Sequence, residues 1–272
     1  MRALRVGVAA AAGTAAVAAV QAAPLLTFAP PLRPLWPVLS GRGRPDHVAL
    51  TFDDGPDSAS TPAFLDLLAS RGVRATFFLL GTMVVRHPDL PRRIVGEGHE
   101  VAVHSWDHRN HLRHPPGPRT RTQLSRTVDL ITERAQVRPR WFRPPYGALT
   151  AADLAAARGE GLRTVLWTAW GRDWEERATP ESVHRLVTRD LRGGGTVLLH
   201  DSDCTSSPLS WRATLGAVPL LLDWCAERGL EVGPLGEHRQ DEHPQDEHLQ
   251  DEHLQDEHRL QAGPPPGRPA TR

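Results

Sequence analysis

Short apolar runs alternate with segments of helical periodicity between His47 and Val232, and this alternation limits the fold more than any other feature of the chain. The runs predict strands, because each is short and ends at polar or turn-forming residues. The predicted strands are His47–Phe52, Ala75–Leu80, Glu100–Val103, Trp141–Arg143, 164–168, 196–199 and Leu230–Val232. The predicted helices between them are Thr61–Ser70, Leu90–Val95, Gln123–Ala135, 151–158, 181–192 and Ala213–Arg228.

Strands that are separated by helices pair in parallel, because parallel neighbours need a crossover connection. The 272 residues allow one large domain or two small ones. About seven consecutive βα units favour a single domain over residues 46–236. The predicted fold is α/β, a single distorted and incomplete (β/α) barrel.

Polar residues that are suited to catalysis follow several of the predicted strands. They are Asp53-Asp54, His104, Arg143 to Tyr146, Asp173-Trp174 and His200. Active sites of (β/α) barrels lie at the carboxyl ends of the strands. We therefore expect these residues to share one site, although each has a simpler explanation, such as a surface turn for Asp53-Asp54-Gly55-Pro56 or a structural role for His200.

Three of these residues suit a metal ion. His104 and His108 are four residues apart, so a helix or helical turn would place both imidazoles on one side. Asp54 would add a carboxylate, and consecutive strand side chains alternate sides, so Asp53 would face a different partner. Two histidines and one acid favour Zn²⁺, with Co²⁺, Ni²⁺ or Mn²⁺ as alternatives.

From His47 to Gly236 the chain resembles the polysaccharide deacetylases with a NodB-like domain, carbohydrate esterase family four. Its five motifs occur in the expected order. They are Thr51-Phe52-Asp53-Asp54-Gly55-Pro56, His104-Ser105-Trp106-Asp107-His108, Arg143-Pro144-Pro145-Tyr146-Gly147, Asp173-Trp174 and Leu198-Leu199-His200-Asp201.

The resemblance implies a role for each matching residue. Asp54, His104 and His108 would hold the metal, and Asp53 would be the general base, oriented by Arg143. The backbone N–H of Tyr146 would stabilise the oxyanion, and His200, supported by Asp173, would protonate the leaving amine. Trp174 and Leu198 would line the pocket for the acetyl methyl group. The chain departs from the family pattern at Trp170, where an aspartate is common.

The resemblance predicts a metal-dependent hydrolase that removes N-acetyl groups from peptidoglycan or another cell-envelope glycan. A deacylase for a small amide or ester is one alternative, and a non-catalytic glycan-binding module is another. The formal net charge of zero argues against a nucleic-acid partner. No protein partner is indicated.

The two ends of the chain differ in composition from the centre. Residues 1–23 carry Arg2 and Arg5 before an Ala/Val-rich stretch, which predicts a signal peptide or membrane anchor and an extracytoplasmic location. A Pro-rich segment over 24–45 predicts a linker or a strap over the domain. Residues 237–272 contain a repeated Gln-Asp-Glu-His unit and a Pro/Gly-rich end, which predict a disordered tail with at most weak metal binding.

Cys204 and Cys225 have no metal-finger spacing, and the sequence leaves open whether they pair.

Overall fold

The computed structural model describes residue 26 and residues 30–113 and 118–238. The predicted signal or anchor segment over 1–23 and the Gln-Asp-Glu-His repeat lie outside the described residues. The described residues belong to one compact unit that ends at His238. None of the described helices is long and apolar enough to cross a membrane.

One parallel sheet forms the centre of the unit. Its strands follow the order β5-β4-β3-β2-β1-β7-β6, and β8 pairs with the beginning of β1. The strands are β1 (His47–Asp53), β2 (Thr76–Leu79), β3 (Glu100–Val103), β4 (Trp141–Phe142), β5 (Arg163–Thr164), β6 (Ala169–Trp170), β7 (Thr196–His200) and β8 (Glu231–Gly233). The curled, all-parallel sheet confirms the predicted incomplete (β/α) barrel.

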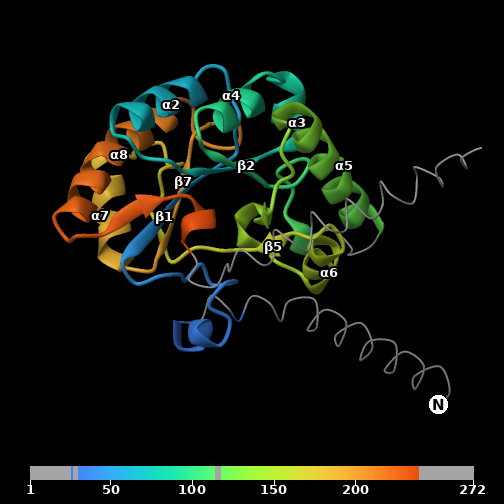
Figure 1. The fold of residues 1–272 in the computed structure, drawn as a ribbon, viewed down its shortest axis with the longest axis horizontal. Coiled ribbons are helices and arrows are strands. Elements are labelled where there is room, and N and C mark those ends of the chain that lie inside the picture. Colours follow the sequence, from blue (N-terminus) through green and yellow to red (C-terminus); the bar gives the residue numbers. More distant parts are fainter. Residues whose placement is uncertain (1–25, 27–29, 114–117, 239–272) are drawn as a thin grey trace, which may run out of the picture. The chain divides into compact units, whose positions relative to one another are not determined.

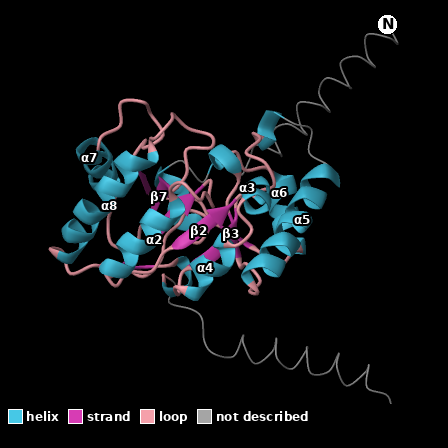
Figure 2. Ribbon diagram, turned by 90° about the horizontal axis from the view of Figure 1, so that it is seen from above, coloured by secondary structure: helices cyan, strands magenta, loops and turns pink. Residues whose placement is uncertain are grey.

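Seven described α-helices surround this sheet (Figure 1). They are α2 (Thr61–Ser70), α3 (Gly81–Arg86), α4 (Leu90–Gly96), α5 (Pro118–Ala135), α6 (Ala151–Gly159), α7 (Pro180–Asp190) and α8 (Trp211–Ala226). Helices α7 and α8 pack together on one side, and α5 and α6 pack together on the other (Figure 2). The short helix α3 was not predicted.

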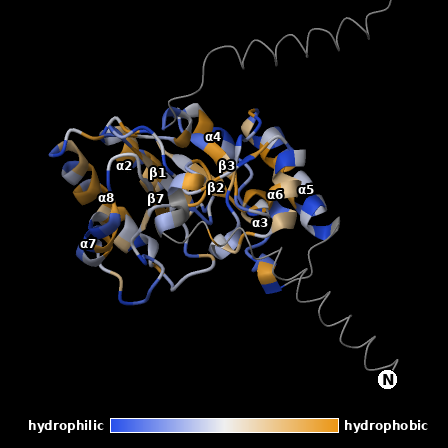
Figure 3. Cartoon of the chain, turned by 90° about the horizontal axis from the view of Figure 1, so that it is seen from below, coloured by the Kyte–Doolittle hydropathy of each residue, from blue (hydrophilic) through white to orange (hydrophobic). Residues whose placement is uncertain are grey.

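The two-residue period of β1 separates the packing core from the barrel interior. Val48, Leu50 and Phe52 pack in the large hydrophobic core beneath the helices. Ala49 belongs instead to a smaller cluster with Phe78 and Ala102 of the neighbouring strands. Helices such as α5 and α7 carry hydrophilic as well as hydrophobic residues (Figure 3), as expected for a layer between this core and solvent. Ala49 and Asp53 are four residues apart on β1 and therefore lie on the same side of the strand. The two-residue period thus places the Asp53 carboxylate in the barrel interior.

The barrel is open between its two edge strands, β5 and β6. We predicted one strand over 164–168, and this was wrong: the structure has two short strands, and residues 165–168 lie between them. Since β5 and β6 are at opposite ends of the strand order, these residues carry the chain across the gap. Their backbone N–H groups do not follow a regular strand pattern. Leu166 N–H donates to Leu39 O (2.9 Å), and Thr168 N–H donates to Thr196 O (3.0 Å). An apolar run alone does not show that its two ends pair with different strands.

Two buried histidines link the beginning and the end of the described unit. His47 Nδ1 and His238 Nδ1 are 2.9 Å apart. His238 Nε2 lies 3.2 Å from the carbonyl oxygen of Gly194, which can only accept, so Nε2 carries the proton of the neutral ring. His47 Nδ1–H therefore donates to His238 Nδ1. Protonation of both rings breaks this bond, because each Nδ1 then carries a hydrogen atom.

We expect this pair to make the fold less stable in acid. Burial, reinforced by Arg44, lowers the pKa of His47 to about 4, and burial, reinforced by His47, lowers that of His238 to about 4. Asp46 and Glu231, which oppose the effect at His47, do not outweigh it. Both values lie below the ordinary 6.5, so the stabilisation is complete above pH 6.5 and is lost as the pH falls towards 4, by up to about 3 kcal/mol per imidazole.

Thermal unfolding in the presence of a chelator, followed between pH 7.5 and 4.5, tests this prediction. His238→Gln should be less stable than the wild type at pH 7.5 and should lose less stability on acidification. Equal pH dependence in the two proteins would contradict it.

Candidate active site

All ten residues predicted for the site come together at the carboxyl ends of the strands. Seven of them line one cavity of about 210 Å³: Asp53, His104, His108, Tyr146, Trp174, Leu198 and His200. The other three, Asp54, Arg143 and Asp173, are buried and contact members of this set.

Asp54, His104 and His108 form a cluster suited to a metal ion. Asp54 Oδ1 lies 3.4 Å from His104 Nε2 and 3.3 Å from His108 Nε2. The candidate ligand atoms of the three residues all lie within 4.8 Å of one another. Asp54 Oδ1 is buried and has no hydrogen-bond partner among the described residues. A buried carboxylate oxygen without a donor, facing two imidazole nitrogens, fits a divalent cation.

The protonation of the cluster also suits a cation. His104 Nδ1 lies 2.8 Å from the carbonyl oxygen of Arg143, so Nδ1 carries the proton and the lone pair of Nε2 faces Asp54. Burial lowers the pKa of His108 to about 4 although Asp54 opposes it, so this ring is neutral at pH 7. Burial alone would raise the pKa of Asp54, but the adjacent histidines hold it well below its ordinary value.

The predicted helical turn over 104–108 was wrong, although both imidazoles do converge. These residues form a loop in which Ser105 has φ +92°. The carbonyls of Ser105 and Trp106 accept bonds from the N–H groups of Gly81 (3.0 Å) and Thr82 (2.9 Å) at the start of α3. Because the carbonyl oxygens of Ser105 and Trp106 already accept hydrogen bonds from α3, forming a helix over 104–108 would add little stability.

A fully buried ion pair sets the position of Asp53. Arg143 Nη1 lies 2.8 Å from Asp53 Oδ1 and 2.7 Å from Thr51 Oγ1. Its remaining donors reach the carbonyl oxygens of Val165 (3.4 Å) and Leu166 (3.1 Å). These carbonyls belong to the gap segment 165–168, so the opening in the barrel supplies acceptors for the guanidinium group.

Asp53 and Asp54 both approach His104 rather than pointing to opposite sides. The strand ends at Asp53, and Asp54 has φ +76°, so the alternation of side chains stops there. His104 Nε2 lies 3.8 Å from Asp53 Oδ2 as well as 3.4 Å from Asp54 Oδ1. The two carboxylates nevertheless have different partners, as expected: Arg143 for Asp53, and the two histidines for Asp54.

A second ion pair holds His200. Its Nδ1 lies 3.0 Å from Asp173 Oδ1, and Asp173 Oδ2 accepts from the His200 backbone N–H (2.7 Å) and from Thr214 Oγ1 (2.7 Å). Burial alone would lower the pKa of His200, but Asp173, with smaller contributions from Asp54 and Asp53, raises it to about 10. His200 is therefore protonated at neutral pH, with Nε2 left to face the cavity.

Three tryptophans, Trp167, Trp170 and Trp174, also line the cavity. The ring centroids of Trp167 and Trp170 are 6.1 Å apart, and those of Trp170 and Trp174 are 5.0 Å apart. Trp170 is the register partner of Leu198, which places it beside the predicted methyl pocket. Replacing the usual aspartate by Trp170 thus makes this wall apolar and leaves the Asp173–His200 pair intact.

Tyr146 lies at the mouth of the cavity. Tyr146 is 62% exposed, and its ring centroid is 4.4 Å from that of His108. Its backbone has φ +59°, a left-handed conformation at the Pro145-Tyr146-Gly147 turn.

The loop after β7 contributes residues that we did not predict. Thr205 Oγ1 donates to Asp54 Oδ2 (2.5 Å), and Cys204 Sγ donates to the Asp54 carbonyl (3.4 Å). Thr205 and Ser206 also line the cavity. The sequence from Ser202 to Ser207 contains no pattern that predicts its contact with Asp54. Cys204 and Cys225 are both free thiols, and Cys225 is buried in the core.

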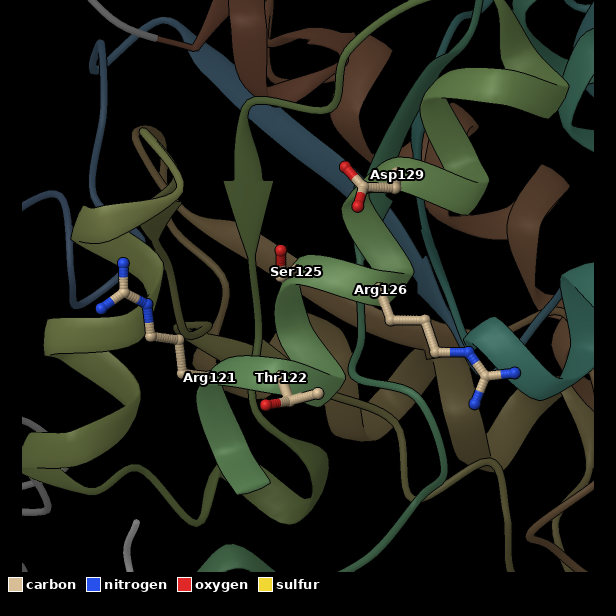
Figure 4. Close-up of a pocket in the computed structure, with 5 residues that line it drawn as sticks. All are labelled: Arg121, Thr122, Ser125, Arg126 and Asp129. Carbon is tan, nitrogen blue, oxygen red and sulfur yellow. The ribbon is translucent and has the colours of Figure 1, made fainter. Parts of the chain in front are cut away.

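A second groove lies on α5 and is lined by Arg121, Thr122, Ser125, Arg126 and Asp129. Figure 4 shows the guanidinium groups of Arg121 and Arg126 pointing away from each other. Arg126 stacks on Trp106, with 3.5 Å between its Cζ and the ring centroid. The two arginines therefore do not converge on a common ligand, and this groove contains none of the candidate catalytic residues.

Comparison with known proteins identifies relatives along most of the described chain. The family profile described as polysaccharide deacetylase matches residues 40–165. A chitooligosaccharide deacetylase from Bradyrhizobium sp. (strain ANU 289) is 37% identical over 195 residues, covering 69% of this chain and 88% of the relative. A peptidoglycan-N-acetylglucosamine deacetylase from Listeria monocytogenes is 37% identical over 161 residues, covering 59% of this chain but only 34% of the relative.

Solved structures agree with these matches. The Bc1960 peptidoglycan N-acetylglucosamine deacetylase superposes with a TM-score of 0.68 at 28% identity, covering 75% of this chain and 92% of that protein. A family pseudoenzyme from Bacillus anthracis superposes with a TM-score of 0.65 at 29% identity, covering 72% of this chain and 67% of that protein. The resemblance seen in the five motifs is confirmed, and this chain belongs to the polysaccharide deacetylase family.

Proposed function

We propose that this protein is a metal-dependent hydrolase that removes N-acetyl groups from amino-sugar polymers, with peptidoglycan or another cell-envelope glycan as substrate. The observation that carries the proposal is the arrangement of three units around one cavity: the Asp-His-His cluster, the Asp53–Arg143 pair and the Asp173–His200 pair. The names of the relatives support the reaction and the class of substrate.

Asp54, His104 and His108 would hold the cation, for which Zn²⁺ is our first choice. A divalent cation in such a site lowers the pKa of a water molecule and polarises a carbonyl group. Thr205 assists by bonding the other oxygen of Asp54, which fixes the carboxylate with Oδ1 towards the histidines.

Asp53 would accept the proton of the attacking water. Arg143 donates to Asp53 Oδ1, which leaves Oδ2 on the side of His104. His200, kept protonated by Asp173, would donate its Nε2 proton to the leaving amine. A base and an acid with opposite charges on one cavity are what hydrolysis of an amide requires.

The remaining residues would position the acyl group. The backbone N–H of Tyr146 would donate to the oxyanion. Trp174 and Leu198 would enclose the acetyl methyl group, and the flanking Trp170 would extend this apolar wall.

We also propose an extracytoplasmic location. The composition of residues 1–23 suits a signal peptide or anchor, and relatives named for peptidoglycan act on an envelope polymer. Residues 46–236 would be the catalytic domain. The preceding segment acts as a strap, since Gly43 N–H donates to Gly194 O (3.0 Å) and Arg44 N–H to His238 O (2.8 Å).

Acetate release from N-acetylglucosamine oligomers and from peptidoglycan tests the proposal. The full chain is stripped with a chelator and reloaded with Zn²⁺ or Co²⁺. We expect release only after reloading, and the better substrate identifies the glycan. Release from small amides or esters alone would favour a non-glycan deacylase. Glycan binding without release from any substrate would favour a binding module.

A further inference from the structure

Next to His104 of the metal cluster, the side chains of Ser105, His111 and Asp153 are linked by hydrogen bonds. His111 Nδ1 is 2.8 Å from Asp153 Oδ1, and His111 Nε2 is 3.3 Å from Ser105 Oγ. A carboxylate can only accept, so Nδ1–H donates to Asp153. Nε2 completes the connection through its bond with the Ser105 hydroxyl, which can donate to the neutral ring or accept from the protonated one.

Asp153 anchors this chain on a rigid element. It lies in the first turn of α6, where its Oδ2 accepts from the backbone N–H (2.8 Å) and the hydroxyl (2.7 Å) of Thr150. Thr150 Oγ1 in turn accepts from Asp153 N–H, which completes the capping box of the helix. Asp153 is fully buried, and the side chain of His111 is only 11% exposed.

The order Asp-His-Ser resembles that of a nucleophilic triad, but the position of Ser105 excludes that role. Ser105 is 3% exposed and does not line the cavity, so its hydroxyl cannot meet a substrate there. What Ser105 does have is an unfavourable backbone, with φ +92°, directly after His104. A residue with a Cβ adopts this conformation only when its surroundings hold it there.

We propose that His111 is a positioning residue for the metal cluster. By tying Ser105 to the start of α6, it holds the loop 104–108 in the conformation that turns both imidazoles towards Asp54. The inference rests on the proposed metal site and adds to it a residue outside the five motifs. His111 is neither a ligand nor in contact with the cavity.

Zn²⁺ affinity, measured by competition with a chromophoric chelator on the full chain, tests this role. Asp54→Ala defines the Zn²⁺ held elsewhere, including by His243, His248, His253 and His258. Loss of outer partners typically weakens metal binding about 10–100-fold, and we expect this loss for the Asp54-dependent site in His111→Leu and in Ser105→Ala. The double variant should be no weaker than either single one, because both changes break the same tether. The visible spectrum of the Co²⁺ form should change in the same variants.

His99→Leu is the matched control. His99 is also buried and bonded, accepting from Ala75 N–H (3.2 Å), but it precedes β3 at the far end of the sheet from the cluster. It should lower the melting temperature without changing Zn²⁺ affinity. If His111→Leu does not fold, Ser105→Ala still decides the matter.

Wild-type affinity in folded His111→Leu or in Ser105→Ala would overturn the inference and leave the proposed function standing. The same holds if the double variant shows the product of the two single losses. Absence of Asp54-dependent Zn²⁺ binding in the wild type would overturn both.

Discussion

Asp53→Asn is expected to lower the rate of deacetylation by about 10²–10⁴-fold, the usual contribution of a general base, while the protein still binds one divalent metal ion at the site. Asparagine has nearly the same shape as aspartate, but it cannot accept the proton of a water molecule at neutral pH. The cluster of Asp54, His104 and His108 does not include Asp53, so its ligand atoms remain.

The same substitution should also reduce stability. Arg143 is fully buried, and Asp53 is the carboxylate that it contacts. Removing one partner of a buried ion pair typically costs about 3–5 kcal/mol. Here the bonds from Arg143 to Thr51, Val165 and Leu166 persist, so we expect the lower end of that range.

Three measurements on one preparation check these expectations: acetate release, metal content and thermal unfolding. Activity has to be compared at a temperature where both proteins are folded. Asp53→Asn protein with wild-type turnover would remove Asp53 from the role of base. Protein as depleted of metal as Asp54→Ala would show that Asp53 is itself a ligand.

Asp54→Ala is expected to abolish both metal binding at the site and activity. The change removes the one carboxylate of the cluster and leaves two imidazoles. Thr205 also loses its acceptor, while the bond from Cys204 Sγ to the Asp54 carbonyl remains. The loss of Zn²⁺ affinity should exceed the 10–100-fold that follows the loss of an outer partner.

Equilibrium dialysis with Zn²⁺ and acetate release, both on the full chain, test this second expectation. Because the Gln-Asp-Glu-His repeat contains four further histidines, a variant with all four changed to asparagine is the control for metal bound outside the cavity. Excess Zn²⁺ that restores full activity to Asp54→Ala would contradict the assignment of Asp54 as a ligand.

The proximity of the ten candidate residues could be predicted because the motifs that contain them end or follow predicted strands. The strand period accounts for the inward position of Asp53. For His104 and His108 the predicted convergence was right, but the reason offered for it was wrong. The bonds that shape their loop come from Gly81 and Thr82 of a helix that the residue pattern did not predict.

The pattern of apolar and polar residues alone therefore determines the alternation of strands and helices and the parallel sheet. It also predicts that the candidate site lies at the carboxyl ends of the strands. These properties follow from local periodicity, which is written along the chain. The gap between β5 and β6, the carbonyls that it offers to Arg143, and the contact of Thr205 with Asp54 are decided only in the folded protein. So is the tether from Asp153 through His111 to Ser105. Some of these contacts join hydrogen-bonding groups that are far apart in the chain. The others depend on the path that a loop backbone takes in the folded barrel. The spacing of residues along the sequence does not determine either kind of contact.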